Sequence, residues 1–134
     1  MTGNHLRSPR GYTLIELMVV MTLIVVFAAM AMAQYRTSIT RSKEAVLKED
    51  LFQLRDAIDQ YYADKNQYPP ALEDLAGGGY IRKVPEDPFT NSASSWQAVP
   101  APPDPNNPIA TPGVYDVKSG AEGTALDGTK YSDW

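Results

Sequence analysis

The stretch GYTLIELMVVMTLIVVFAAMAMA, residues 11–33, decides the fold of this chain. From residue 17 to residue 33 its most polar side chain is that of Thr22, and the only charged residue between residues 12 and 33 is Glu16. A helix of about 20 apolar residues crosses the hydrocarbon core of a bilayer, because each residue adds about 1.5 Å. The stretch therefore predicts a transmembrane helix, and it raises the question of why a carboxylate lies near its start.

A polar, basic segment precedes the apolar run. Residues 1–11 carry Arg7 and Arg10 and no acid, whereas the chain of 134 residues has a net charge of −4. Basic flanks stay on the cytoplasmic side, so we expect the N-terminus in the cytoplasm and the acidic remainder across the membrane. A secretory signal peptide is the alternative, because it also has a basic head and residues 31–33 resemble its cleavage site. However, the apolar region of a signal peptide is shorter than the apolar run of this chain.

The helical pattern continues beyond the apolar run. No proline or glycine lies between residues 12 and 67, and apolar residues recur every three or four positions, which predicts one amphipathic stripe. The stripe consists of Leu47, Leu51, Leu54, Ile58 and Tyr61. We expect one continuous helix of about 50 residues, roughly 75–80 Å long. Glu44 and Lys48 are expected to form an ion pair on its exposed side.

The residues after the helix predict a small sheet. Tyr68-Pro69-Pro70 ends the helix, and a short helical turn from Ala71 is expected to stop at the glycines of residues 77–79. Strands are expected at 95–99 and 113–118, separated by a proline-rich loop. The predicted fold class is α+β, in which the amphipathic half of the long helix packs on a small antiparallel sheet of two to four strands.

The composition excludes several classes of chemistry. The chain has no cysteine, and its single histidine, His5, precedes the apolar run. A disulfide framework, a thiolate zinc site, a cysteine nucleophile and a histidine-based triad are therefore excluded in the folded part. The acidic balance argues against nucleic-acid binding. No catalytic constellation is visible, so we expect no enzyme.

The start of the apolar run resembles the processing motif of type IV pilins and their relatives. Residues 10–17, RGYTLIEL, place a glycine, an aromatic residue and a TLIEL block directly before the apolar span. Three further motifs, YP at 68–69, VPEDPF at 84–89 and VYDVKSG at 114–120, are similar to the major pseudopilins of type II secretion systems. The resemblance extends from residue 10 to residue 134 and is weakest in the proline-rich loop.

This resemblance implies a pilin-like fold and a structural function. A prepilin peptidase of the inner membrane would cut after Gly11 and methylate the new amine of Tyr12. Residues 1–11 would then be a leader, residues 12–34 the transmembrane and filament-core helix, and residues 35–134 a periplasmic globular domain. The implied product is a periplasmic pseudopilus filament of identical subunits, with minor pseudopilins and an inner-membrane assembly platform as further partners.

Glu16 is the candidate residue for filament assembly. A lone carboxylate in lipid costs a few kcal/mol and usually has a function. Glu16 lies about one helical turn after Tyr12, so in a bundle of such helices it would neutralise the Tyr12 amine of a neighbouring subunit and select one axial offset. The alternative is that the Glu16 side chain snorkels to the cytoplasmic edge of the membrane.

The C-terminal loop is a second candidate site, on the strength of the resemblance. Family members commonly bind calcium there, and SGAEG at 119–123 matches their motif in part, with Glu122 where aspartate is usual. The implied ligands are Glu122, Asp127 and Asp133 with backbone carbonyls, since calcium takes about six to eight oxygens. The alternative is a solvated glycine turn without an ion, tied by the packing of Tyr131 and Trp134.

Two other functions stay open from the sequence. A type IV pilus subunit shares the N-terminal motif, but such pilins frequently carry a C-terminal disulfide, which this cysteine-free chain cannot form. A single-pass, membrane-anchored periplasmic binding module would need neither cleavage at Gly11 nor the carboxylate of Glu16.

Overall fold

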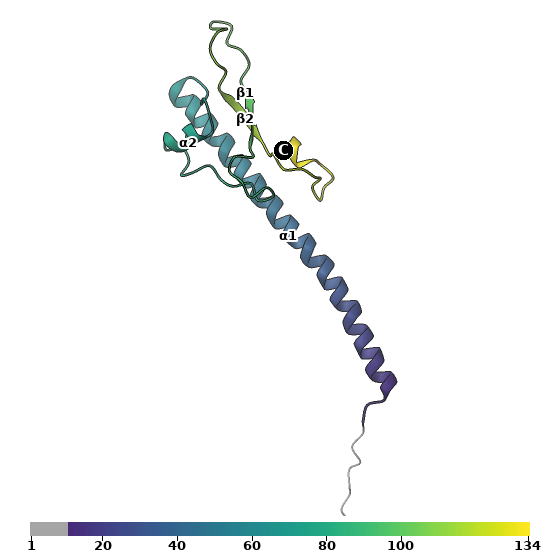
Figure 1. Cartoon of the computed structure of the whole chain (residues 1–134). Coiled ribbons are helices and arrows are strands. Elements are labelled where there is room, and N and C mark those ends of the chain that lie inside the picture. Colours follow the sequence, from purple (N-terminus) through teal and green to yellow (C-terminus); the bar gives the residue numbers. More distant parts are fainter. Residues whose placement is uncertain (1–10) are drawn as a thin grey trace, which may run out of the picture. The chain divides into compact units, whose positions relative to one another are not determined.

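The computed structural model describes residues 11–134. Its elements are α1 (Leu14–Lys65), α2 (Glu73–Gly77), β1 (Gln97–Pro100), β2 (Val114–Lys118) and the 3₁₀ helix η1 (Tyr131–Asp133) (Figure 1). The chain divides into two compact units, Met1–Ser38 and Ile39–Trp134. The predicted α+β class, with a long N-terminal helix and a small antiparallel sheet, is confirmed. Most of the predicted leader, including Arg7, Arg10 and His5, lies outside the described residues.

The helix α1 is uninterrupted over 52 residues, as the absence of proline and glycine predicts. It ends at Lys65, where Asn66 adopts a left-handed φ of 56° and donates its N–H to the Tyr62 carbonyl at 2.8 Å. Asparagine tolerates this conformation better than most residues, which makes it a suitable helix terminator. Pro69 and Pro70 then keep the chain from re-entering the helix.

The apolar stripe predicted on α1 forms the core of the unit Ile39–Trp134. All five stripe residues are buried, and every one except Tyr61 is at most 1% exposed. The stripe packs against α2, β2 and several loop aromatics, represented by Leu75, Val117 and Trp96. The core is therefore a single layer of side chains between one face of α1 and the elements that cover it.

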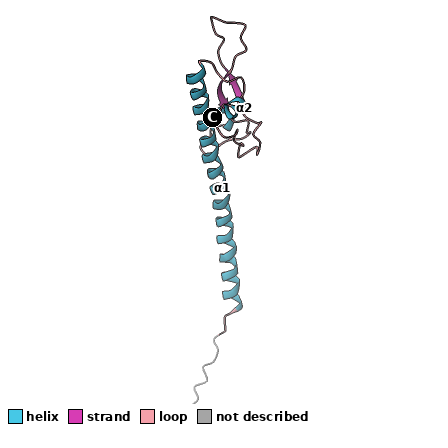
Figure 2. Cartoon of the chain, turned by 90° about the vertical axis from the view of Figure 1, so that its left-hand side faces the viewer, coloured by secondary structure: helices cyan, strands magenta, loops and turns pink. Residues whose placement is uncertain are grey.

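The sheet has two strands in the described part of the chain. They pair antiparallel, with Gln97 opposite Lys118 and Val99 opposite Asp116, and the register shifts between Val99 and Pro100. The predicted first strand began at residue 95, but Trp96 precedes β1 and donates its indole N–H to the Pro85 carbonyl at 2.7 Å. The proline-rich segment 101–113 connects the strands as the long loop in Figure 2.

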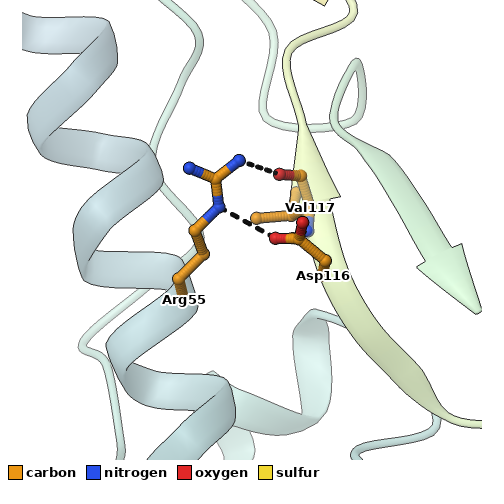
Figure 3. Close-up of polar contacts among 3 residues, drawn as sticks. All are labelled: Arg55, Asp116 and Val117. Atoms are coloured by element: carbon orange, nitrogen blue, oxygen red, sulfur yellow. Dashed lines mark hydrogen bonds and ion pairs between the residues drawn. The ribbon is translucent and has the colours of Figure 1, made fainter. Parts of the chain in front are cut away.

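Arg55 links α1 to β2 (Figure 3). Its Nε donates to Asp116 Oδ1 at 2.8 Å, and its Nη2 donates to the Val117 carbonyl at 3.0 Å. The Arg55 and Asp116 side chains are 40% and 32% exposed, so solvent screens the ion pair and we expect it to contribute about 0–1 kcal/mol. The contact joins the middle of α1 to β2 and adds little to the stability of the unit.

A buried carboxylate organises the VPEDPF turn and the start of the C-terminal loop. Asp87 is fully buried, and its Oδ1 accepts the N–H of Phe89 at 2.8 Å and that of Thr90 at 3.4 Å. Its Oδ2 accepts the Ser119 hydroxyl at 2.6 Å, and Ser119 Oγ in turn accepts the Ala121 N–H at 3.0 Å. Because both oxygens of this acid are hydrogen-bonded, Asp87 can stay buried and hold the first residue of the loop.

Candidate functional site

The N-terminal candidate site begins at Gly11, the first described residue. A Cβ added to Gly11 would meet no heavy atom within 4 Å, and its φ lies outside the left-handed region. The described fold therefore gives no reason for a glycine at this position. Tyr12, next in the chain, is 87% exposed. Both residues are accessible to a molecule that recognises them, and their roles in cleavage and methylation stay predictions.

Thr13 and Glu16 form a capping box at the start of α1. The Glu16 N–H donates to Thr13 Oγ1 at 3.2 Å, and the Thr13 N–H donates to Glu16 Oε2 at 3.4 Å. This reciprocal pair satisfies two donors that have no partner within the helix. Our interpretation of the sequence missed this local role, although Thr-x-x-Glu is its ordinary signal. Glu16 thus has a function within one chain, beside the predicted one between chains.

The apolar surface that follows Glu16 is uncovered in the single chain. Residues 11–36 are all exposed, and α1 contains a segment long and apolar enough to cross a membrane. The Thr22 hydroxyl donates to the Met18 carbonyl at 2.8 Å, so this polar group is satisfied inside the helix. Such a surface requires lipid or other apolar helices around it.

The structure does not gather Glu122, Asp127 and Asp133 into one site. No group of three or more histidine, cysteine, aspartate or glutamate side chains that could hold a metal ion occurs within residues 11–134. The hydroxyl of Thr129 donates to Asp127 Oδ1 at 2.6 Å and its N–H at 2.9 Å, and these two bonds lower the pKa of Asp127. The three carboxylates therefore do not converge within residues 11–134, and calcium binding stays a prediction.

Glu44 of α1 forms hydrogen bonds with the C-terminal loop. Its Oε1 accepts the Tyr131 hydroxyl at 2.9 Å and the Leu126 N–H at 2.8 Å. The predicted ion pair with Lys48 is wrong: the described residues contain no such pair, and Lys48 Nζ lies 4.4 Å from the centre of the Trp134 ring. The spacing rule considers one helix alone, whereas the partners of both side chains arrive from the other end of the chain.

Aromatic packing holds the C-terminal loop in place. The packing of Tyr131 and Trp134 was part of the second alternative that the sequence left open for this loop. The Tyr131 side chain is buried. Its ring stacks on the Phe89 ring with 4.3 Å between the ring centres, and it meets the Trp134 ring edge-on with 5.3 Å between the centres. The Trp134 indole N–H donates to Thr129 Oγ1 at 2.7 Å. The C-terminal residue is therefore fixed both by its ring and by its N–H.

Alkaline pH should open this loop. Burial raises the pKa of Tyr131 from 10.0 to about 12, and the hydrogen bond to Glu44 adds to the rise. Since the folded pKa is the higher one, the neutral hydroxyl stabilises the loop fully below pH 10, and this stabilisation is lost as the pH rises through about 12. We expect the last tyrosine to ionise together with a change in tryptophan fluorescence, measured by absorbance and emission.

The matched variant for this titration is Tyr131→Phe, which keeps the ring and removes the ionising group. It should lose the last ionisation step and the fluorescence change that accompanies it. An unaltered late step in this variant would show that another tyrosine is responsible.

Comparisons with known proteins agree with the motif at the helix start. The family of the prokaryotic N-terminal methylation motif matches residues 6–32. A type II secretion system core protein G from Pseudomonas aeruginosa is 30% identical, and the match covers 63% of this chain and 71% of that protein. The protein of the same name from Escherichia coli is 31% identical, over 61% of this chain and 68% of that protein. No solved structure matches the chain.

Proposed function

The chain belongs to the family of the type II secretion system core protein G, and from this premise we propose that it is a pseudopilin, the repeating subunit of a filament. The observation that carries the proposal is the uncovered apolar helix directly behind a methylation motif. A free chain with this surface is stable in lipid, and a bundle of identical helices offers the same apolar surroundings outside lipid. The role is structural, and the chain catalyses nothing itself.

Processing is the first step of the proposed function. A prepilin peptidase cuts between Gly11 and Tyr12 and methylates the new amine. The exposure of Tyr12 and the open space around Gly11 support this assignment, because the peptide is accessible and the fold does not require a glycine there. A peptidase whose active site must approach the substrate backbone closely requires a residue without a Cβ at the cleavage position.

Assembly is the second step. The apolar part of α1 anchors the chain once across the inner membrane, with the N-terminus in the cytoplasm and the unit Ile39–Trp134 in the periplasm. An assembly platform then moves subunits from the membrane into the pseudopilus, where identical copies and minor pseudopilins surround each helix. Glu16 pairs with the methylated Tyr12 amine of a neighbour and sets the offset between them.

The mature N-terminus tests the proposal. We expect mass spectrometry of the protein purified from its native membrane to find a chain that begins at Tyr12 and carries one added methyl group on its amine. A Gly11→Val chain, whose fold has room for the larger side chain, should retain residues 1–11 and form no filament. Full-length, unmethylated protein in active cells would instead support a membrane-anchored binding module.

A further inference from the structure

The C-terminal loop, residues 119–134, contains a tight turn of its own. The Ala125 N–H donates to the Thr129 carbonyl at 2.7 Å, and the Gly128 N–H donates to the Ala125 carbonyl at 3.0 Å. Gly128 has a φ of 90°, which a glycine adopts without strain. The Tyr131 N–H then donates to the Gly123 carbonyl at 3.3 Å and closes the base of the turn. The turn is therefore formed by the loop's own backbone.

One oxygen of Glu44 joins this turn to α1 at two points. Leu126 lies inside the turn and Tyr131 directly after it, and both donate to Glu44 Oε1. These donors are 82 and 87 residues away from Glu44 in the sequence, so one carboxylate links the two ends of the unit Ile39–Trp134. Hydrogen bonds to an ionised carboxylate are about twice as strong as those between neutral groups.

The groups around Glu44 are those that bind a carboxylate and not a cation. A calcium ion needs oxygen lone pairs from several directions, whereas the Leu126 N–H and the Tyr131 O–H both direct hydrogens at Glu44 Oε1. Lys48, one turn further along α1, places its own positive charge over the Trp134 ring. Glu122 and Asp133 are exposed and belong to no metal-binding group within residues 11–134.

We propose that Glu44 closes the C-terminal loop, for which the resemblance implied calcium, and that the loop stays folded whatever the calcium concentration. Glu44, Tyr131 and the Leu126 N–H are named here the carboxylate clasp. The clasp concerns how each subunit keeps its end folded, and not how subunits assemble. It holds or fails independently of cleavage at Gly11.

Limited trypsin digestion of the full chain in detergent micelles tests the clasp. Lys130 is exposed and lies in the loop, so the rate of cleavage after Lys130 reports how often the loop opens. We expect the unaltered chain to be cut at one slow rate with calcium chloride and with a chelator. Glu44→Ala should be cut after Lys130 faster by a factor on the order of ten to a hundred, and calcium should not slow it.

Two variants serve as controls. Glu49→Ala removes an acid of α1 whose carboxylate accepts the Gln53 side chain at 3.0 Å and no group of the C-terminal loop among residues 11–134, and it should leave the cleavage rate unchanged. Glu44→Gln keeps an acceptor oxygen without the charge, and its rate should lie between those of the unaltered chain and Glu44→Ala.

Cleavage after Arg55, inside α1, separates local opening from global unfolding. If Glu44→Ala is cut after Arg55 as fast as after Lys130, the whole unit has unfolded in that variant. Tyr131→Phe then tests the clasp, since it removes one hydrogen bond and keeps the stacked ring. The proposal is overturned if the chelator accelerates cleavage of the unaltered chain and calcium restores it. It is also overturned if Tyr131→Phe and Glu44→Ala both leave the loop as resistant as before.

Discussion

A Glu16→Gln chain is expected to be cleaved after Gly11, methylated at Tyr12 and inserted into the membrane, but to form few or no filaments. Cleavage would give Tyr12 a positively charged amine, which a helix bundle would remove from water. Leaving one partner of a buried ion pair without the other costs about 3–5 kcal/mol. Because every subunit of a filament would bear this cost, the loss of assembly should be nearly complete.

Glutamine is the informative replacement because Glu16 has a capping role within the chain and a second, proposed role between subunits. In the capping box the Glu16 side chain accepts the Thr13 N–H, and glutamine retains that acceptor. Glu16→Ala would remove the cap and the charge together, so its effect could not be assigned to either. Glu16→Gln removes the charge alone, and a defect in assembly would then belong to the ion pair.

Thr13→Ala is the complementary control. It removes the hydroxyl that accepts the Glu16 N–H at 3.2 Å and keeps the carboxylate. Loss of an N-cap costs about 0.5–2 kcal/mol of helix stability, so we expect filaments in reduced number. Sedimentation of sheared filaments and electron microscopy measure assembly, and mass spectrometry of the N-terminus confirms processing in each variant. Normal filaments from Glu16→Gln would exclude the neighbour pairing and leave the capping box as the function of Glu16.

The features that the sequence predicts correctly are the local ones. The extent of α1 follows from the missing helix breakers, and its buried face follows from the spacing of Leu47, Leu51 and Leu54. The α+β class follows because a one-sided apolar stripe requires something to cover it. The predicted first strand begins two residues before β1, since Trp96 is a residue type common in strands but fills the core beside the VPEDPF turn.

The candidate sites also divide into a local one, which the sequence indicates, and one formed by residues far apart in the chain, which it does not. The capping box spans four residues and was readable from Thr13 and Glu16 alone. The clasp was not readable, because nothing near Glu44 in the sequence indicates that Tyr131 will reach it. Motif matching pointed instead to the acids of the C-terminal loop, which carry the right charge for an ion. Asp127 instead accepts both the N–H and the hydroxyl of Thr129, and the three acids form no metal-binding group within residues 11–134.

Leu54→Asn should unfold the unit Ile39–Trp134. Leu54 is 0% exposed and belongs to the single-layer core between α1 and its cover. Removing a buried leucine side chain costs about 2–5 kcal/mol, and an amide without hydrogen-bond partners adds about 1–3 kcal/mol. The free energy of unfolding of a small domain is about 5–15 kcal/mol in total, so this one substitution removes much or all of it.

Phe52→Asn is the matched control, since Phe52 lies two residues away on the same helix and is 66% exposed. It should change the free energy of unfolding by no more than about 0.5 kcal/mol. Denaturant titration of the full chain in micelles, followed by the fluorescence of buried Trp96, measures both variants. If Leu54→Asn retained the midpoint of the unaltered chain, the core would not depend on the α1 stripe, and the thin sheet would have to support the fold alone. Two strands of four and five residues bury too little for that, because an isolated two-stranded sheet is at best marginally stable in water.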